Sequence, residues 1–194
     1  MFTQTHLLIG NAISRVIEKK YPQRMDKKAF QYGCIIPDFC LSPISVPHYI
    51  NKSFGSIAEM IQKPRSFPQT IKEKQKFYIE LGIITHYISD YFCQAHNFSA
   101  YRNCISHFIY EGKLSNEFRA IDLQPFCYTN LSGPQNKLLE SLARLPAFIK
   151  NRHLEYQSEK REMRTDVVFC LEVASTVVLN ITHHSQHIAL EKAA

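Results

Sequence analysis

One segment near the middle of the chain constrains the fold most strongly, because it repeats one spacing of histidine and carboxylate. His86 and Asp90 are four residues apart, and so are His107 and Glu111, with His96 between the two pairs. Residues at this spacing on a helix lie on one face. Two consecutive helices can therefore point all five side chains into one shared space. Imidazole and carboxylate suit zinc and other divalent transition metals, so the pattern predicts a metal site.

The residues between Leu81 and Glu111 that surround these pairs are mostly apolar or aromatic. Polar groups buried among such neighbours without partners are costly. A single histidine–carboxylate pair at this spacing is most often solvated or hydrogen-bonded. Two pairs with a fifth ligand between them favour a metal instead.

Apolar residues recur at helical spacing along most of the chain, which favours an all-α fold. The chain has 194 residues, of which 6 are glycine, 45% are hydrophobic and 21% are charged. These values are ordinary for a globular protein of one domain. We expect residues 1–194 to form a single-domain multi-helix bundle with the metal cluster at one end.

The apolar periodicity predicts a series of helices. They are expected at residues 1–21, 26–36, 51–62, 70–92, 99–114, 137–153 and 159–184. Pro37 is expected to end the second helix and leave Asp38 in a loop, and Pro146 to kink or break a later one. His183 and His187 are expected in a frayed, solvent-facing tail outside the metal site.

Charge and the N-terminal residues bear on partners and location. The formal net charge of +6 suits an anionic partner, but Lys and Arg are scattered, so nucleic acid is the less favoured anionic partner.

Residues 1–6 hold no basic region and Leu7–Gly10 is too short for an apolar signal core, so we expect a cytoplasmic protein. No apolar run is expected to reach transmembrane length. The six cysteines lack CxxC spacing and are expected as reduced thiols, which leaves the metal hypothesis to histidine and carboxylate.

The same residues carry a resemblance to a known family. Leu81-Gly82, then His86, Asp90 and His96 at their spacing, then Asn97-Phe98 and an H-x3-E pair resemble the zinc-dependent phospholipase C family. That family includes the bacterial phosphatidylcholine-preferring phospholipases and the catalytic domain of clostridial alpha-toxin. The S1/P1 nucleases share the fold and the first part of the motif but usually end it with H-x3-D. The glutamate at the end of the pair therefore favours the phospholipase branch.

The resemblance implies two to three zinc ions at one end of a helical bundle. It assigns nine residues of this chain to them in three groups: Asp38, His48, His86 and Asp90 at the first zinc; His96, His107 and Glu111 at the second; and His6, a bridging Asp90 and the amine of Met1 at a third. Asp38 is also the candidate catalytic residue, as a general base or water-orienting group. These assignments are implied by the family and do not follow from the spacing alone.

The resemblance also implies an activity. A zinc-activated water would cleave the glycerol–phosphate bond of a phospholipid, with peripheral membrane contact and without a transmembrane segment. Three alternatives stay open: a related phosphoesterase or nuclease that acts on nucleic acid or soluble phosphoesters, a non-catalytic metal-stabilised helical protein, and a helical interaction module without metal.

Overall fold

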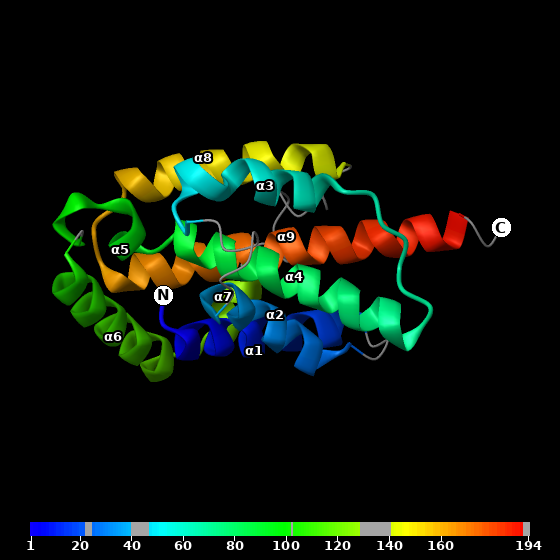
Figure 1. The fold of residues 1–194 in the computed structure, drawn as a ribbon, viewed down its shortest axis with the longest axis horizontal. Coiled ribbons are helices and arrows are strands. Elements are labelled where there is room, and N and C mark those ends of the chain that lie inside the picture. Colours follow the sequence, from blue (N-terminus) through cyan, green and yellow to red (C-terminus); the bar gives the residue numbers. More distant parts are fainter. Residues whose placement is uncertain (22–24, 40–46, 102, 129–140, 192–194) are drawn as a thin grey trace.

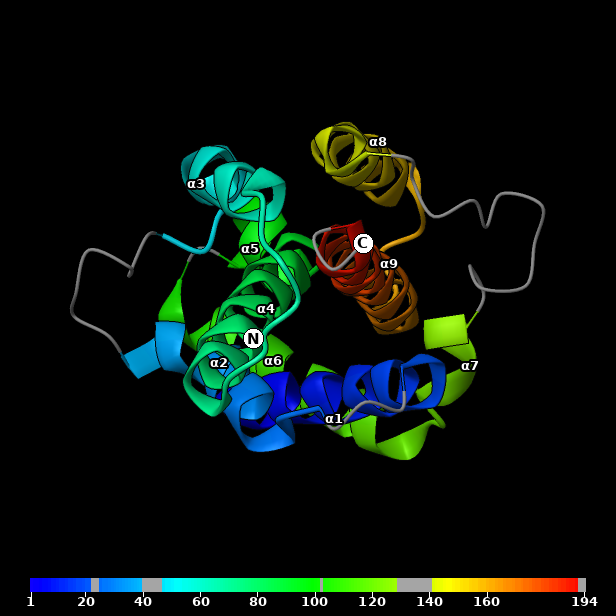
Figure 2. The same ribbon diagram turned by 90° about the vertical axis from the view of Figure 1, so that its right-hand side faces the viewer.

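Two long helices, α4 (Ile71–Tyr91) and α9 (Met163–Glu191), run through the middle of the computed structural model (Figure 1). On one side of this central pair lie α1 (Thr3–Lys20) and α2 (Lys27–Phe39). On the other side lie α3 (Ile50–Gln62) and α8 (Leu145–Ser158), so that the helices form three layers (Figure 2). The structure describes residues 1–21, 25–39, 47–101, 103–128 and 141–191.

Shorter helices complete the fold. The short α5 (Gln94–Asn97) and the longer α6 (Cys104–Ala120) lie together at the left end of Figure 1, where α4 ends. A third, α7 (Gln124–Tyr128), packs near α1 and α9, and single 3-10 turns occupy Ser99–Tyr101 and Leu142–Arg144. The described residues contain no strand, which confirms the all-α prediction.

Helix α4 carries the first histidine–carboxylate pair from the surface into the core. Its start is fixed by a capping box, in which the Thr70 hydroxyl accepts from the Glu73 backbone N–H and the Glu73 carboxylate accepts from the Thr70 N–H. The first turn is exposed, whereas every residue from Leu81 to Tyr91 is buried. The end of α4 that holds His86 and Asp90 is therefore enclosed by other helices.

Two glycines let α2 and α4 approach each other closely. A Cβ atom added at Gly33 would lie 2.2 Å from the backbone oxygen of Ile79, and one added at Gly82 would lie 2.3 Å from the backbone oxygen of Phe30. No side chain larger than hydrogen fits at either position, because the obstructing atoms belong to backbone. This crossing lies one turn of helix before the functional residues, with Gly82 four residues before His86 and Gly33 five before Asp38.

One expectation about prolines was wrong, and the other was confirmed in part. Pro37 lies inside α2, which continues to Phe39, so Asp38 is in the last helical turn and not in a loop. Only Asp38 and Phe39 follow the proline in α2, so the proline disturbs only the last turn of the helix. The packing of α2 on α4 stabilises that turn. Pro146 marks a break and not a kink, because α8 begins at Leu145 directly after the 3-10 turn. A proline in the first turn of a helix costs no hydrogen bond. Part of the predicted helix 137–153 lies outside the described residues.

Helix α9 differs from the sequence-based expectations in its apolar length and in where it ends. Residues Met163–Leu190 are long and apolar enough to cross a membrane by length and composition. However, 78% of the most apolar window is buried against the rest of the protein, as is typical of a central core helix. The helix also continues to Glu191, so His183 and His187 lie in ordered helix and not in a frayed tail.

The glycine crossing generates a prediction about stability. Gly33→Ala and Gly82→Ala should each lower the free energy of unfolding by about 3 kcal/mol, because the new methyl group collides with backbone. Gly55→Ala is the matched control, since Gly55 is helical and a Cβ there meets nothing within 4 Å. It should be neutral or stabilising by about 0.5–1 kcal/mol. Urea unfolding measures all three, and equal stability of the three variants would contradict the close crossing.

Candidate metal centre

Asp90, in the last turn of α4, lies at the centre of a group of nitrogen atoms. Its side chain is fully buried. Oδ1 lies 2.5 Å from the α-amino nitrogen of Met1 and 3.5 Å from Nε2 of both His6 and His96. These groups come from the chain start, α1 and α5. Residues far apart in the sequence thus meet at one buried oxygen.

The second oxygen of the same carboxylate faces a different group. Oδ2 of Asp90 lies 3.0 Å from Nδ1 of His48 and 3.3 Å from Nε2 of His86. That same Nε2 lies 3.7 Å from Oδ1 of Asp38, whose side chain is 20% exposed. One carboxylate therefore links the residues predicted for the first zinc to those predicted for the third.

Glu111 on α6 organises the neighbouring group. Its Oε1 lies 2.8 Å from Nε2 of His107 and 3.2 Å from Nε2 of His96. The Met1 amine lies 3.0 Å from the same oxygen. His96 and Met1 are therefore shared between Glu111 and Asp90, and the two halves of the cluster adjoin.

The close crossing of α2 and α4 sets the orientation of His86. Nδ1 of His86 lies 2.9 Å from the backbone oxygen of Cys34. A carbonyl oxygen only accepts, so Nδ1 carries the proton and Nε2 offers its lone pair to the cluster. Among the described residues, Nε2 has no hydrogen-bond partner. A histidine fixed by a backbone carbonyl through one nitrogen and free at the other is typical of metal ligands.

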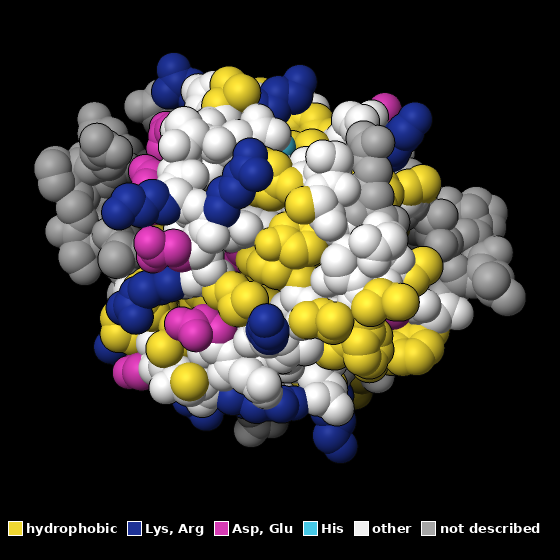
Figure 3. Space-filling view, turned by 90° about the vertical axis from the view of Figure 1, so that its left-hand side faces the viewer, with side chains coloured by type: hydrophobic (Ala, Val, Ile, Leu, Met, Phe, Trp, Pro, Cys, Tyr) yellow, Lys and Arg dark blue, Asp and Glu magenta, His cyan; other side chains and the backbone are white. Residues whose placement is uncertain are grey.

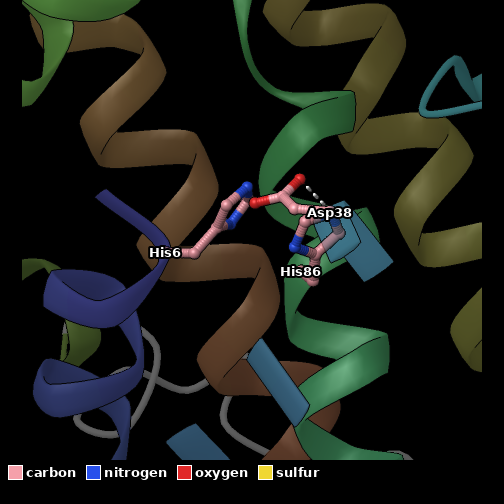
Figure 4. A group of neighbouring side chains, drawn as sticks. All are labelled: His6, Asp38 and His86. Atoms are coloured by element: carbon pink, nitrogen blue, oxygen red, sulfur yellow. Dashed lines mark ion pairs between the residues drawn. The ribbon is translucent and has the colours of Figure 1, made fainter. Parts of the chain in front are cut away.

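His6 is also buried, at 1% exposed, but neither of its ring nitrogens is fixed by a hydrogen bond among the described residues. Its ring stacks on that of His86, with centroids 3.9 Å apart. Figure 4 shows His6, Asp38 and His86 pointing toward one another from α1, α2 and α4. Burial and the adjacent His6 lower the pKa of His86, which favours the neutral imidazole, the form that binds metal.

The donor atoms fit zinc by type and by spacing. Two atoms bound to one tetrahedral zinc lie about 3.3 Å apart, given bonds of about 2.0–2.1 Å. The distances from the carboxylate oxygens of Asp38, Asp90 and Glu111 to the histidine nitrogens run from 2.8 to 3.7 Å. Unpartnered buried imidazole nitrogens are costly without an ion to bind them. The residues present therefore fit a zinc centre.

The electrostatics of the cluster depend on opposite charges in a dry site. Burial raises the pKa of Glu111, but the His96 hydrogen bond and the Met1 amine outweigh it and bring the pKa down to about 2. Burial lowers the pKa of the Met1 amine, but Asp90 and its other neighbours raise it overall to about 11. Asp90 likewise has a pKa well below its ordinary value, because the amine and His96 outweigh its burial.

Three histidines of the cluster have shifted pKa values, and the directions differ. Burial, with the nearby His6, lowers the pKa of His86 well below its ordinary value, and burial lowers that of His96. Burial also acts to lower the pKa of His48, but its hydrogen bond to Asp90 and that carboxylate's charge raise it overall. His48 therefore holds a proton at a pH where His86 is neutral.

All nine residues named from the resemblance come together in the structure, and their roles as zinc ligands stay predictions. Cys93 was not among them. Its sulfur lies within 4.8 Å of the ligand atoms of His96 and Glu111, and its side chain is buried. Its position three residues after Asp90 and three before His96 places a sulfur between two proposed ligands, a spacing that differs from CxxC.

The remaining histidine pair lies elsewhere. The rings of His183 and His187 have centroids 6.1 Å apart near the C-terminal end of α9. That end lies on the opposite side of the molecule from α5 and α6 (Figure 1). The prediction that this pair lies outside the metal site is therefore consistent with its position.

Comparisons with known proteins give one match. A family model described as zinc dependent phospholipase C matches residues 5–163. None of the curated proteins or solved structures compared with the chain is significantly similar to it. The expectation of a single domain over residues 1–194 stays a prediction.

The raised pKa of His48 generates a prediction about pH. Zinc binds the neutral imidazole, so it must displace the proton that Asp90 holds on His48. The apparent zinc affinity should fall by at least about tenfold between pH 7.5 and pH 5.5, as the zinc-free form gains that proton. Isothermal titration in buffers of different ionisation enthalpy should show proton release on zinc binding, with less release by His48→Gln. An affinity that does not change over this range would contradict the arrangement.

Proposed function

Because the chain belongs to the zinc-dependent phospholipase C family, we propose that it hydrolyses the glycerol–phosphate bond of a phospholipid. The products would be diacylglycerol and a phosphorylated head group. The observation that supports this proposal most directly is the cluster around Asp90 and Glu111, because its spacing and unpartnered nitrogens suit zinc. We further propose two to three zinc ions per chain, held by the nine residues of that cluster. The cytoplasmic location stays a proposal as well.

Zinc held at these positions would acidify a bound water and neutralise phosphate oxygens. The residues of the chain then have separate tasks. Asp38 is the most solvent-accessible carboxylate of the cluster, at 20% against 8% for Glu111 and 0% for Asp90. Its Oδ2 accepts a hydrogen bond of 3.0 Å from the Thr3 hydroxyl, while Oδ1 faces His86. We assign Asp38 to orient the attacking water and accept its proton.

Exposed hydrophobic side chains gather beside the same cluster. Phe39, Tyr49 and Phe108 directly follow the proposed ligands Asp38, His48 and His107, and are 69%, 46% and 67% exposed. The start of the chain connects the surroundings of Phe108 and Asp38. The ring centroids of Phe2 and Phe108 lie 4.9 Å apart, and the adjacent Thr3 donates a hydrogen bond to Asp38.

Helix α6 extends this surface away from the ligands. Ile105 and Ile109 are 74% and 51% exposed, and together with Phe108 they follow the i, i+3, i+4 spacing of one helix face. Figure 3 shows hydrophobic side chains gathered over much of the surface at this end of the molecule. We name Phe39, Tyr49, Ile105, Phe108 and Ile109 the apolar rim. An apolar rim favours a lipid surface over nucleic acid, which would require a concentration of basic side chains.

A substrate panel tests the proposed function. Zinc-loaded protein should release phosphorylated head group from phospholipid vesicles at least about tenfold faster than it cleaves a p-nitrophenyl phosphodiester or single-stranded DNA and RNA. Asp38→Asn should lower turnover by about a hundredfold, within the range for loss of a general base. Preferred cleavage of nucleic acid would assign the protein to the nuclease alternative. Full zinc content without turnover of any substrate would make it a metal-stabilised protein without this activity.

The apolar rim is tested in the same assay with dispersed and assembled lipid. The double variant Ile105→Ser/Ile109→Ser should lose most of its turnover on vesicles but retain most of it on a dispersed short-chain phospholipid. Ile71→Ser is the matched control, since Ile71 is 81% exposed yet lies about 28 Å along α4 from Asp90. Equal losses of turnover on both forms of lipid, or an equal loss in the control variant, would contradict a role of the apolar rim in binding the lipid surface.

A further inference from the structure

Asp166, near the start of α9, is a buried carboxylate whose hydrogen bonds to described residues do not include any of the proposed zinc ligands. It is 0% exposed and accepts four hydrogen bonds. The Gln94 backbone N–H and the Tyr110 hydroxyl donate to Oδ2, each at 2.9 Å. The Tyr156 hydroxyl and the Gln94 side-chain amide donate to Oδ1, at 2.8 and 3.2 Å. Each oxygen thus receives two bonds, and all four donors among the described residues are uncharged.

Two of these bonds fix α5, the four-residue helix that carries His96. A helix leaves its first N–H groups without internal partners, and the N-cap residue Cys93 offers no side-chain bond to them. Asp166 takes the place of the missing cap by accepting from the backbone of Gln94, the first residue of α5. His96 follows two residues later.

The other end of α5 is fixed by a separate set of bonds. The Asn97 side-chain amide donates to the backbone oxygens of Tyr91 and Cys93, at 2.9 and 2.7 Å. Its oxygen lies 2.8 Å from Nε2 of His153 on α8. Helix α5 is too short to be stable by itself, so its position depends on these side-chain bonds and on Asp166.

The third bond reaches the helix that carries the other ligands of the same group. Tyr110 lies on α6 directly before Glu111 and three residues after His107. Its ring is also held against Tyr101, with centroids 4.5 Å apart. One carboxylate on α9 therefore contacts the helix of His96, two residues before that ligand, and the helix of Glu111, one residue before it.

Simple packing does not account for this arrangement. A buried carboxylate without a cation is costly, and an apolar side chain of similar size would fill the same space more cheaply. Burial raises the pKa of Asp166 to about 6, so the group is still ionised at neutral pH and can accept from all four donors. The convergence of these donors fixes the separation of α5 and α6.

We propose that Asp166 is a positioning residue for the zinc held by His96, His107 and Glu111, acting through Gln94 and Tyr110. The inference rests on the proposed zinc centre. It adds a residue beyond the segment matched by the family model, which ends at residue 163.

Two tyrosines provide a matched test. Tyr110→Phe and Tyr156→Phe each remove one hydroxyl that donates to Asp166, but only Tyr110 lies next to a ligand. Zinc-loaded protein is mixed with an excess of a coloured chelator, and the number and rate of zinc ions released are recorded. Tyr110→Phe should release one zinc at least about tenfold faster than the unsubstituted protein, within the range for outer-shell residues. Tyr156→Phe should release it less than about threefold faster, and Asp166→Asn should resemble or exceed Tyr110→Phe.

Thermal unfolding with and without zinc separates positioning from stability. If Asp166 acts only on stability, both tyrosine variants will unfold at lower temperature by similar amounts while zinc release stays unchanged, and the proposal fails. Equal acceleration of release in the two variants also overturns it. If Asp166→Asn does not fold, the tyrosine pair still decides the outcome. Absence of zinc from the unsubstituted protein would instead remove the proposed function itself.

Discussion

The buried carboxylate of Asp90 is the interaction on which the rest of the structure depends. An ionised carboxylate without exposure to water is strongly destabilising unless positive charge or hydrogen bonds compensate it. Here α4 carries that carboxylate into the core, and nitrogen atoms from the chain start, α1, α5 and the segment before α3 surround it. The close approach of α2 at Gly33 and Gly82 completes the arrangement. Much of the helix packing at this end can be understood as a requirement to balance one charge.

Some of this arrangement was accessible from the sequence and some was not. The spacing of His86 and Asp90 predicts two side chains on one helical face, and α4 has that geometry. The contributions of His6, Asp38 and His48 came only from the resemblance, because no local pattern reveals that separate helices meet. Pro37 predicted a helix end from local preference, but tertiary packing of α2 on α4 maintains the helix to Phe39. Asp166 carried no signal at all, because its partners lie 10 to 72 residues away.

The site and the surface beside it point toward the same chemistry. The proposed zinc ligands are enclosed on the inner side by apolar helices, while Asp38 keeps access to solvent beside Phe39. Along α6, one face presents His107 and Glu111 to the cluster, and Ile105, Phe108 and Ile109 are exposed to solvent. A phosphodiester at the edge of an apolar surface is the chemistry of a phospholipid head group. Metal centre and apolar rim therefore support one substrate class.

The central claim is that the cluster around Asp90 and Glu111 binds zinc, and the zinc content of the protein tests it most directly. Protein purified without chelator should contain two to three zinc ions per chain by elemental analysis. His86→Ala and Glu111→Gln should each lose at least one, because each removes a donor from a different half of the cluster. His184→Ala, near the C-terminal end of α9 and outside the cluster, should keep the full number. Substoichiometric zinc that neither of the first two substitutions changes would contradict the account.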